Sequence, residues 1–310
     1  MMRLSRRRII VVLGGVLTAL AMAVPTGRAA TTTLNGDWAP FTRCPVSDSS
    51  MLAADGTNTV AFCLGSDSPS GSVTLGKVTA PTGNVNLQLG LIENNNTGAM
   101  TVVAPSGGAI SAAPATIPGG LLGLMCPSNI VAVSTVCNEI TSTALNTVTA
   151  VVEPAGNPSD FSLANALSSG QPIVTIPVKI HLENSLLGSG CYLGSNSSPI
   201  LLHPENTTAP SLSVDLFDAD GTPDPTGVME AVDETGTTQS DTSAAIPGAT
   251  GCGLLGILNS AINLKTGLPS AAGSNAFTLN NASSSLAGLT APSTNDGQLL
   301  SQYWNSALQS

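Results

Sequence analysis

The stretch PIVTIPVKIHLENSLLGSGCYLGSNSSPILLH, residues 172–203, constrains the fold more than any other part of the chain. Apolar and polar residues alternate along its first half, from Ile176 to Leu182. A period of two places the apolar side chains on one face of a β-sheet. Each of them contributes roughly 1.5–3 kcal/mol only when it is buried, so a second layer must cover this face. The stretch therefore predicts a strand, a cysteine-bearing loop and a second short strand in a layered β structure.

Further short runs with partial alternation predict more strands, separated by turn clusters rich in Ser, Asp, Pro, Asn and Gly. They cover residues 57–64, 72–78, 85–92, 99–104, 144–153 and 276–280. This spacing favours antiparallel hairpins. We expect a mainly β fold, an antiparallel β-sandwich or distorted barrel, in one domain over residues 30–310. The low-complexity residues 105–120 are expected to form a mobile loop.

One or two short helices are expected to cover an end of the sheets. Residues 253–267 carry apolar side chains at helical spacing, and Gly267 and Pro269 are placed to end the helix. Residues 298–308 predict an amphipathic helix that packs against the sheet. A shorter helix is expected at 159–167, with Ser159 or Asp160 as its cap.

The chain contains six cysteines, an even number without a Cys-x-x-Cys pair. This pattern indicates structural disulfides in an oxidising compartment rather than zinc or redox chemistry. Fifteen pairings are possible, and the sequence does not choose among them. We favour pairing between neighbours, namely Cys44 with Cys63, Cys126 with Cys137, and Cys191 with Cys252.

Residues 1–29 are predicted to be an export signal. A basic start precedes the apolar run 9–24, and Gly27-Arg28-Ala29 offers small residues at the cleavage positions. The apolar run is shorter than the roughly 20 residues of a membrane-spanning helix. The sequence leaves open whether export uses the general secretory or the twin-arginine route.

The remaining chain is strongly acidic. Five of the nine basic residues lie within residues 1–29, which leaves four basic against 19 acidic residues and a net charge of −15. Nucleic acids and anionic lipids attract basic surfaces, so this balance argues against both as partners. No further apolar run of comparable length follows, so no transmembrane helix is expected after signal removal. Association with the cell envelope and the oligomeric state are left open.

Acidic residues concentrate between Asp215 and Asp241, where Asp218, Asp220 and Asp224 surround Gly221. One interpretation is a calcium loop, because alternate aspartates around a glycine turn can wrap a hard cation. The spacing of a standard calcium loop fails, since its first and twelfth positions would be Leu216 and Gly227. The other interpretation is a hairpin turn in which Gly221 adopts a positive φ.

Residues able to perform acid, base or nucleophilic chemistry are few. The chain has two histidines, His181 on the polar face of the principal strand and His203 in a loop. A serine hydrolase would need one of them beside a serine and a carboxylate. No Gly-x-Ser-x-Gly elbow, phosphate loop, dinucleotide fingerprint or His-Glu-x-x-His motif is present. The sequence therefore nominates no catalytic or cofactor-binding residue.

Two segments carry a family resemblance: KIHLENSLLGSGCYLGSNSSPILLH at 179–203, and GATGCG followed by INLKTGLPSAAGSNAFTLN within 248–280. Through the pattern His-Leu-x-Asn, Leu-Gly, Cys-Tyr-x-Gly-Ser and a later Gly-Cys-Gly with Gly-Leu-Pro-Ser, the chain resembles a group of uncharacterised secreted proteins of actinobacteria. The resemblance implies export and a common fold. It transfers no activity and no catalytic residue.

We therefore expect a secreted, non-catalytic protein that acts outside the cell or in its envelope, in a structural or binding role. The alternatives are a secreted hydrolase and a pore-forming β-barrel of the envelope.

Overall fold

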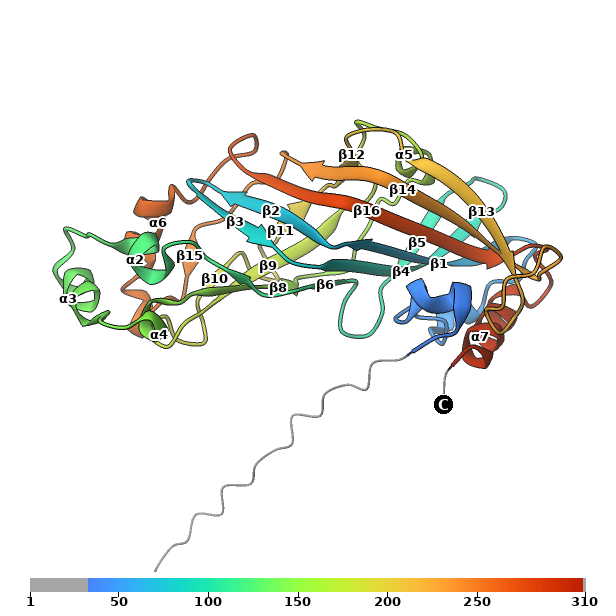
Figure 1. Cartoon of the computed structure of the whole chain (residues 1–310), viewed down its shortest axis with the longest axis horizontal. Helices are drawn as coiled ribbons and strands as arrows, with labels where there is room; N and C mark the ends of the chain where they lie inside the picture. Colours follow the sequence, from blue (N-terminus) through green and yellow to red (C-terminus); the bar gives the residue numbers. More distant parts are fainter. Residues whose placement is uncertain (1–32, 309–310) are drawn as a thin grey trace, which may run out of the picture. The chain divides into compact units, whose positions relative to one another are not determined.

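The computed structural model describes residues 33–308, which form one folded unit made mainly of antiparallel β-sheet (Figure 1). The predicted export signal, residues 1–29, lies outside the described residues. Two sheets pack against each other as layers of a sandwich, as expected from the alternating strand. None of the helices within residues 33–308 is long and apolar enough to span a membrane.

The larger sheet has ten strands, with β12-β14-β16-β1-β4-β5 as its main path. β13 pairs with β14, β6 with β4, and the β2–β3 hairpin joins through β16. The strands are β1 (Thr59–Ser68), β2 (Ser70–Leu75), β3 (Val78–Thr82), β4 (Val85–Asn94), β5 (Met100–Val103), β6 (Ile110–Ala112), β12 (Glu205–Asn206), β13 (Ser211–Phe217), β14 (Met229–Asp241) and β16 (Ala276–Leu289).

The smaller sheet has six strands in the order β15-β10-β9-β8-β7, with β11 also paired to β9. Its strands are β7 (Ala115–Thr116), β8 (Thr149–Pro154), β9 (Ile176–Glu183), β10 (Tyr192–Leu193), β11 (Ile200–Leu202) and β15 (Ala249–Thr250). The alternating stretch forms β9 at its centre. The inward side chains from Ile176 to Leu182 are at most 5% exposed, and they pack in one cluster with Leu64, Val73 and Leu89 of the larger sheet.

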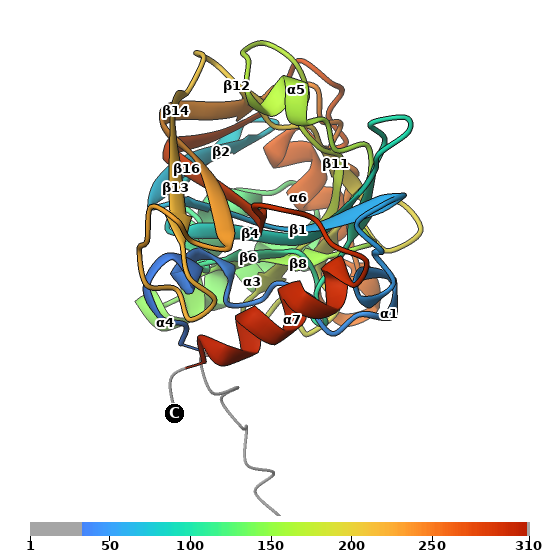
Figure 2. The ribbon, with the colours of Figure 1, turned by 90° about the vertical axis from the view of Figure 1, so that its right-hand side faces the viewer.

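The opposite face of the larger sheet carries a second core. The 3₁₀ helix η1 (Gly36–Phe41), α1 (Ser49–Leu52) and α7 (Asp296–Ser306) cover it. Figure 2 shows α1 and α7 beside β1 at this end. Trp38 is fully buried and meets Phe41 and Phe217 edge to face. The buried Asp296 anchors α7, because its Oδ2 accepts the Ala61 amide at 2.8 Å.

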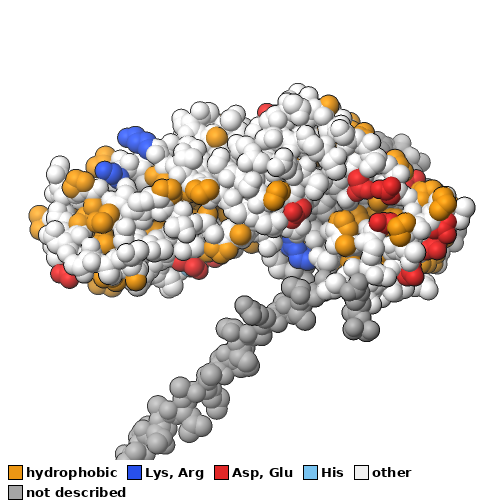
Figure 3. Space-filling view, in the orientation of Figure 1, with side chains coloured by type: hydrophobic (Ala, Val, Ile, Leu, Met, Phe, Trp, Pro, Cys, Tyr) orange, Lys and Arg blue, Asp and Glu red, His pale blue; other side chains and the backbone are white. Residues whose placement is uncertain are grey.

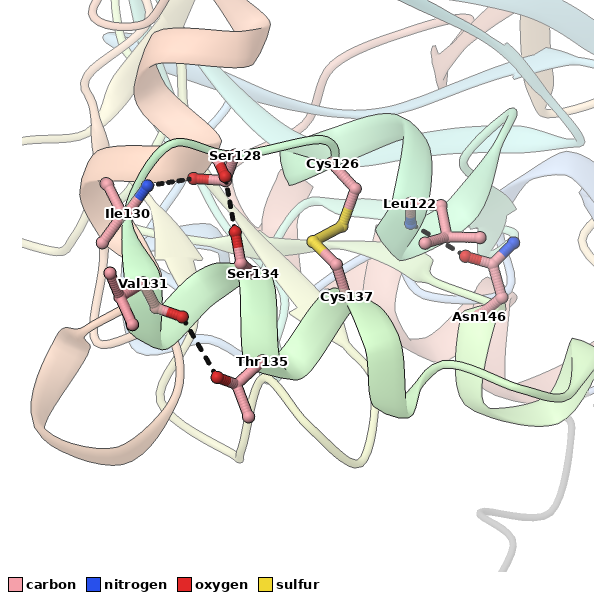
Figure 4. The surroundings of a disulfide bond; sticks show 9 residues. All are labelled: Leu122, Cys126, Ser128, Ile130, Val131, Ser134, Thr135, Cys137 and Asn146. Carbon is pink, nitrogen blue, oxygen red and sulfur yellow. Dashed lines mark hydrogen bonds between the residues drawn. A yellow bond between two sulfur atoms is a disulfide. The ribbon is translucent and has the colours of Figure 1, made fainter.

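A group of short helices lies at the opposite end of the folded unit (Figure 1). We call it the helical cap; it comprises α2 (Gly120–Met125), α3 (Val131–Glu139), α4 (Thr143–Asn146), η2 (Leu254–Gly256) and α6 (Asn259–Thr266). α2 packs against α6, α3 and α4. The Cys126–Cys137 disulfide ties α3 to the end of α2, and Ser134 Oγ donates to the Ser128 carbonyl beside it (Figure 4).

The three disulfides are the expected pairs, Cys44–Cys63, Cys126–Cys137 and Cys191–Cys252. Each has a distinct position. The first joins the second core to β1, the second closes the helical cap, and the third links the loop before β10 to the start of η2. Each disulfide therefore joins two cysteines that are neighbours in the sequence.

Several expected elements are different in the structure. Residues 105–120, expected to be a mobile loop, carry β6 in one sheet and β7 in the other. The expected strand 72–78 is a hairpin, because Gly76 turns the chain with a φ of 59° between β2 and β3. The strand expected at 276–280 continues as β16 to Leu289, since its Ser-rich half pairs with β1 and β14 on both sides.

The helix expected at 253–267 begins only at Asn259. Gly253, Leu255 and Gly256 all have positive φ, which is incompatible with a right-handed helix. Gly267 ends α6 in the left-handed conformation, as expected. The helix expected at 159–167 shrinks to α5 (Leu163–Ala166), and Ser162 caps it instead of Ser159 or Asp160. The C-terminal helix, α7, packs on the larger sheet as predicted.

Candidate functional site

An apolar crevice separates the two sheets where the β2–β3 hairpin faces β7, β8, β9 and β11. The volume of the crevice is about 110 Å³. Its walls include Leu75 and Ala80 from the larger sheet, and Ala150 and Val178 from the smaller one. The exposed Ala113 also contributes to the lining, so the crevice opens to solvent. An apolar space of this kind is suited to an apolar ligand.

The sequence produces this crevice through alternation in both sheets. β9 directs Ile176, Val178 and Ile180 toward it. The hairpin opposite carries small and medium-sized side chains, such as Val78 and Ala80. Small side chains facing a flat aliphatic wall leave unfilled space between the layers.

Only a few polar groups reach the crevice. Thr82 Oγ1 is buried and has no hydrogen-bond partner among residues 33–308. Gln239 and Asp241, both buried, reach the crevice from β14. A ligand hydroxyl or carbonyl could satisfy Thr82, because an unpaired buried hydroxyl has an energetic cost that a hydrogen bond removes.

A second, smaller cavity contains a buried carboxyl group. Its volume is about 40 Å³. It lies between β14 and the segment around α5, which contributes Phe161 and Leu167 to its lining. Glu234 lines it and is 6% exposed. Burial raises the pKa of Glu234 from 4.5 to about 7. The carboxyl oxygens of Glu234 reach solvent and have no hydrogen-bond or ionic partner within residues 33–308, and a pKa of about 7 lets the group take or release a proton near neutral pH.

The two cavities are neighbours, since Pro204 and Gln239 line both. They make up what we call the intersheet site: two adjacent, mainly apolar cavities, with Thr82 lining one and Glu234 lining the other. The site can hold an apolar body and offers one titratable group to a polar head. Ser66 and Ser284 also line the second cavity, and Ser284 Oγ donates to Ser66 Oγ at 3.0 Å.

His181 lies on the outer face of the smaller sheet, as expected for the polar side of β9. Its ring stacks on Tyr192 with centroids 4.4 Å apart, and its Nδ1 lies 3.5 Å from Glu153 Oε1 and 3.7 Å from Glu183 Oε1. Lys179 Nζ is 3.3 Å from Glu153 Oε2. Partial burial, followed by the Glu153 carboxylate, raises the pKa of Tyr192. These contacts form a surface cluster, and no serine or cysteine takes part in them.

His203 does meet a serine and a carboxylate. Its Nδ1 is 3.1 Å from Ser243 Oγ, and Ser243 Oγ donates to Asp241 Oδ1 at 2.7 Å. In a catalytic triad the histidine stands between serine and carboxylate, whereas here the carboxylate binds the serine directly. Asp241 also accepts the backbone amides of His203 and Ser243. The group therefore ties the end of β14 to the chain entering β12, and the hydrolase alternative stays a prediction.

The aspartates considered for calcium lie in the turn between β13 and β14. Asp220 Oδ1 accepts the Thr222 amide at 3.0 Å, and Asp224 Oδ1 accepts the amide and hydroxyl of Thr226. These bonds lower the pKa of both aspartates. The Asp218 amide bonds the Thr222 carbonyl across the turn. This is the hairpin interpretation in detail, and calcium at Asp218, Asp220 and Asp224 stays a prediction.

A further carboxylate group escaped the sequence analysis. Asp37 lies near Asp215 and Asp233, and Ser285 donates to Asp233. Burial raises the pKa of Asp37 and of Asp233, and the Asp215 charge adds to both shifts. Within residues 33–308, no three side chains of His, Cys, Asp or Glu are placed to hold a metal ion.

Comparisons with known proteins leave the assignment to the geometry. No known family model, curated protein or solved structure matches the chain. The resemblance to secreted actinobacterial proteins stays a prediction.

Sequence analysis missed the intersheet site. Glu234 stands in an acidic stretch that suggests a solvated surface, and the segment that buries it lies some 60–70 residues earlier in the chain. A weak signal was available, since Glu234 and Val232 share one face of a strand by alternation.

Proposed function

We propose that the protein is exported and binds, outside the cytoplasm, a small amphipathic molecule in the intersheet site. The observation that carries the proposal is an apolar crevice beside a second cavity lined by Glu234, a residue that is 6% exposed and makes no side-chain hydrogen bond or ion pair within residues 33–308. An apolar ligand body would lie between the hairpin and β9. A hydroxyl or amine head group would pair with the partly desolvated Glu234 carboxyl.

Export is the second part of the proposal. It is supported by the basic and apolar pattern of residues 1–29 and by the three disulfides, which persist in oxidising compartments. Association with the cell envelope belongs to the same proposal.

Titration with the neutral apolar dye N-phenyl-1-naphthylamine tests the binding role. Residues 30–310 contain the whole folded unit and avoid dye binding by the apolar run of the leader. We expect saturable fluorescence enhancement with one site. Ala80→Leu or Ala150→Leu should fill the crevice and weaken dye binding at least tenfold, because both side chains line it.

The exposed Ala99→Leu change is the matched control and should leave dye binding unchanged. Thermal unfolding of each variant shows whether the added side chain is accommodated. Enlarging a tightly packed core residue costs about 1–3 kcal/mol, whereas filling a real cavity does not. Absence of saturable binding, or equal affinity in the filled variants, refutes the proposal.

A further inference from the structure

The helical cap exposes large aliphatic side chains to an unusual degree. Leu254 is 79% exposed, Leu255 94%, Leu264 80% and Val131 82%. Partly exposed neighbours extend this surface: Leu122 on α2, Ile130 directly before α3 and Ile257 directly after η2. Single exposed aliphatic side chains are ordinary, but several gathered on contiguous elements mark an interaction surface. Figure 3 shows hydrophobic side chains spread over this end of the folded unit.

The exposed leucines belong to an ordered segment. Cys252 is bonded to Cys191, and its amide donates to Asn259 Oδ1 at 2.8 Å. The Gly253 amide donates to the Leu187 carbonyl at 2.7 Å. Leu255 has a φ of 55°, a left-handed conformation that is uncommon for leucine, and it directs a nearly fully exposed side chain outward. The anchored loop therefore presents an apolar tip in a fixed position.

Charge separates this tip from the rest of the molecule. Glu139 and Lys265 are the charged residues within 119–146 and 244–275. Lys77 adds a second positive charge, since its amide bonds the Thr266 carbonyl and its side chain lies beside Gly267. Two of the four basic residues beyond residue 29 thus lie in or beside α6, although the net charge of residues 30–310 is −15. In the view of Figure 3, acidic side chains gather toward the end that carries β13 and α7.

A net charge of −15 argues against binding to anionic lipids only where the charge is spread evenly over the surface, and on this protein it is not. Charges separated by more than about 8–10 Å are screened at physiological salt. The helical cap itself carries one negative and one positive group, Glu139 and Lys265, and Lys77 lies beside α6, so an anionic membrane repels this end less than the acidic end. The acidic end is repelled, which would orient the cap toward the bilayer.

We propose that the helical cap docks the protein on a phospholipid bilayer with anionic headgroups. Leu254, Leu255 and Leu264 would enter the boundary between headgroups and acyl chains, while Lys77 and Lys265 remain at headgroup level. This mode of attachment places the cap on the membrane surface without crossing it. It rests on observations separate from the intersheet site.

Flotation with large unilamellar vesicles tests the proposal on residues 30–310. Vesicles of phosphatidylcholine with 30% phosphatidylglycerol are compared with pure phosphatidylcholine. We expect binding to the mixed vesicles and at least fivefold weaker binding to the neutral ones. The combined change Leu254→Ser, Leu255→Ser and Leu264→Ser should lower the bound fraction at least tenfold and leave the unfolding temperature unchanged, because these side chains are exposed.

The matched control is Leu212→Ser with Val214→Ser, which removes two exposed aliphatic side chains from β13 instead. It should bind vesicles like the unmodified protein. A second variant, Lys77→Gln with Lys265→Gln, should weaken binding to the mixed vesicles and leave binding to neutral vesicles unchanged. Equal binding by the triple variant, equal loss in the control, or no vesicle binding at all overturns the proposal. A dimer that the triple variant dissociates, seen by light scattering without vesicle binding, would assign the surface to a second copy instead.

Discussion

Glu234 should make the protein less stable as the pH rises toward neutrality. Its folded-state pKa is raised from 4.5 to about 7, so between these values the folded state holds a proton that the unfolded state has released. Stability is therefore greatest below pH 4.5 with respect to this group and falls as the pH passes through 7. A shift of this size corresponds to at most about 3 kcal/mol. The residue as a whole is 6% exposed, but its carboxyl oxygens still reach solvent, so screening lowers the contribution to about 1–2 kcal/mol.

Glu234→Gln removes the titration and keeps the shape of the side chain. The free energy of unfolding, measured by denaturant titration from pH 4.5 to 8, should fall more steeply for the unmodified protein than for the variant. The two curves should differ by about 1–2 kcal/mol more at pH 8 than at pH 4.5, or roughly 2–4 °C in melting temperature. Other carboxyls with raised pKa, such as Asp296, are present in both proteins and cancel in the difference.

Glu230→Gln is the matched control, because Glu230 lies on the same strand with its side chain exposed. It should leave the pH profile parallel to that of the unmodified protein. Parallel profiles for Glu234→Gln as well would refute the reasoning, since they would mean that Glu234 is solvated and no buried carboxyl lines the second cavity.

Two further predictions concern local packing. Gly297→Ala should destabilise the protein by about 1–3 kcal/mol in thermal unfolding, although alanine normally favours a helix, because its Cβ would lie 1.8 Å from the Met51 carbonyl oxygen. The exposed Gln298→Ala should be neutral or slightly stabilising, and a neutral Gly297→Ala would contradict the close approach of α7. Cys126→Ser with Cys137→Ser should remove up to about 3 kcal/mol from the helical cap, seen as lost hydrogen-exchange protection in α2 and α3 with β9 unchanged. Equal loss of protection in β9 would show that the cap and the sandwich unfold together.

Local patterns in the sequence predict the sandwich well. The alternation from Ile176 to Leu182 identified the central strand and its buried face, because a period of two records which side of a strand is apolar. The closely spaced cysteines suggested pairs that lie close together in the structure. The stripe of α7 likewise indicated a helix on the larger sheet. In each case the information lies within about 60 residues of chain.

The sequence by itself indicated a layered β fold, disulfide-forming cysteines and a buried face for the principal strand. Tertiary structure alone decided that Glu234 is enclosed, that the crevice opens between the hairpin and β9, and that Leu254 and Leu255 stand outside the core. The apolar stripe from Leu254 to Leu264 was read as one helix, but left-handed residues turn its first part outward. The physical reason is that periodicity reports the chemistry of a face, whereas burial depends on which distant segment covers that face.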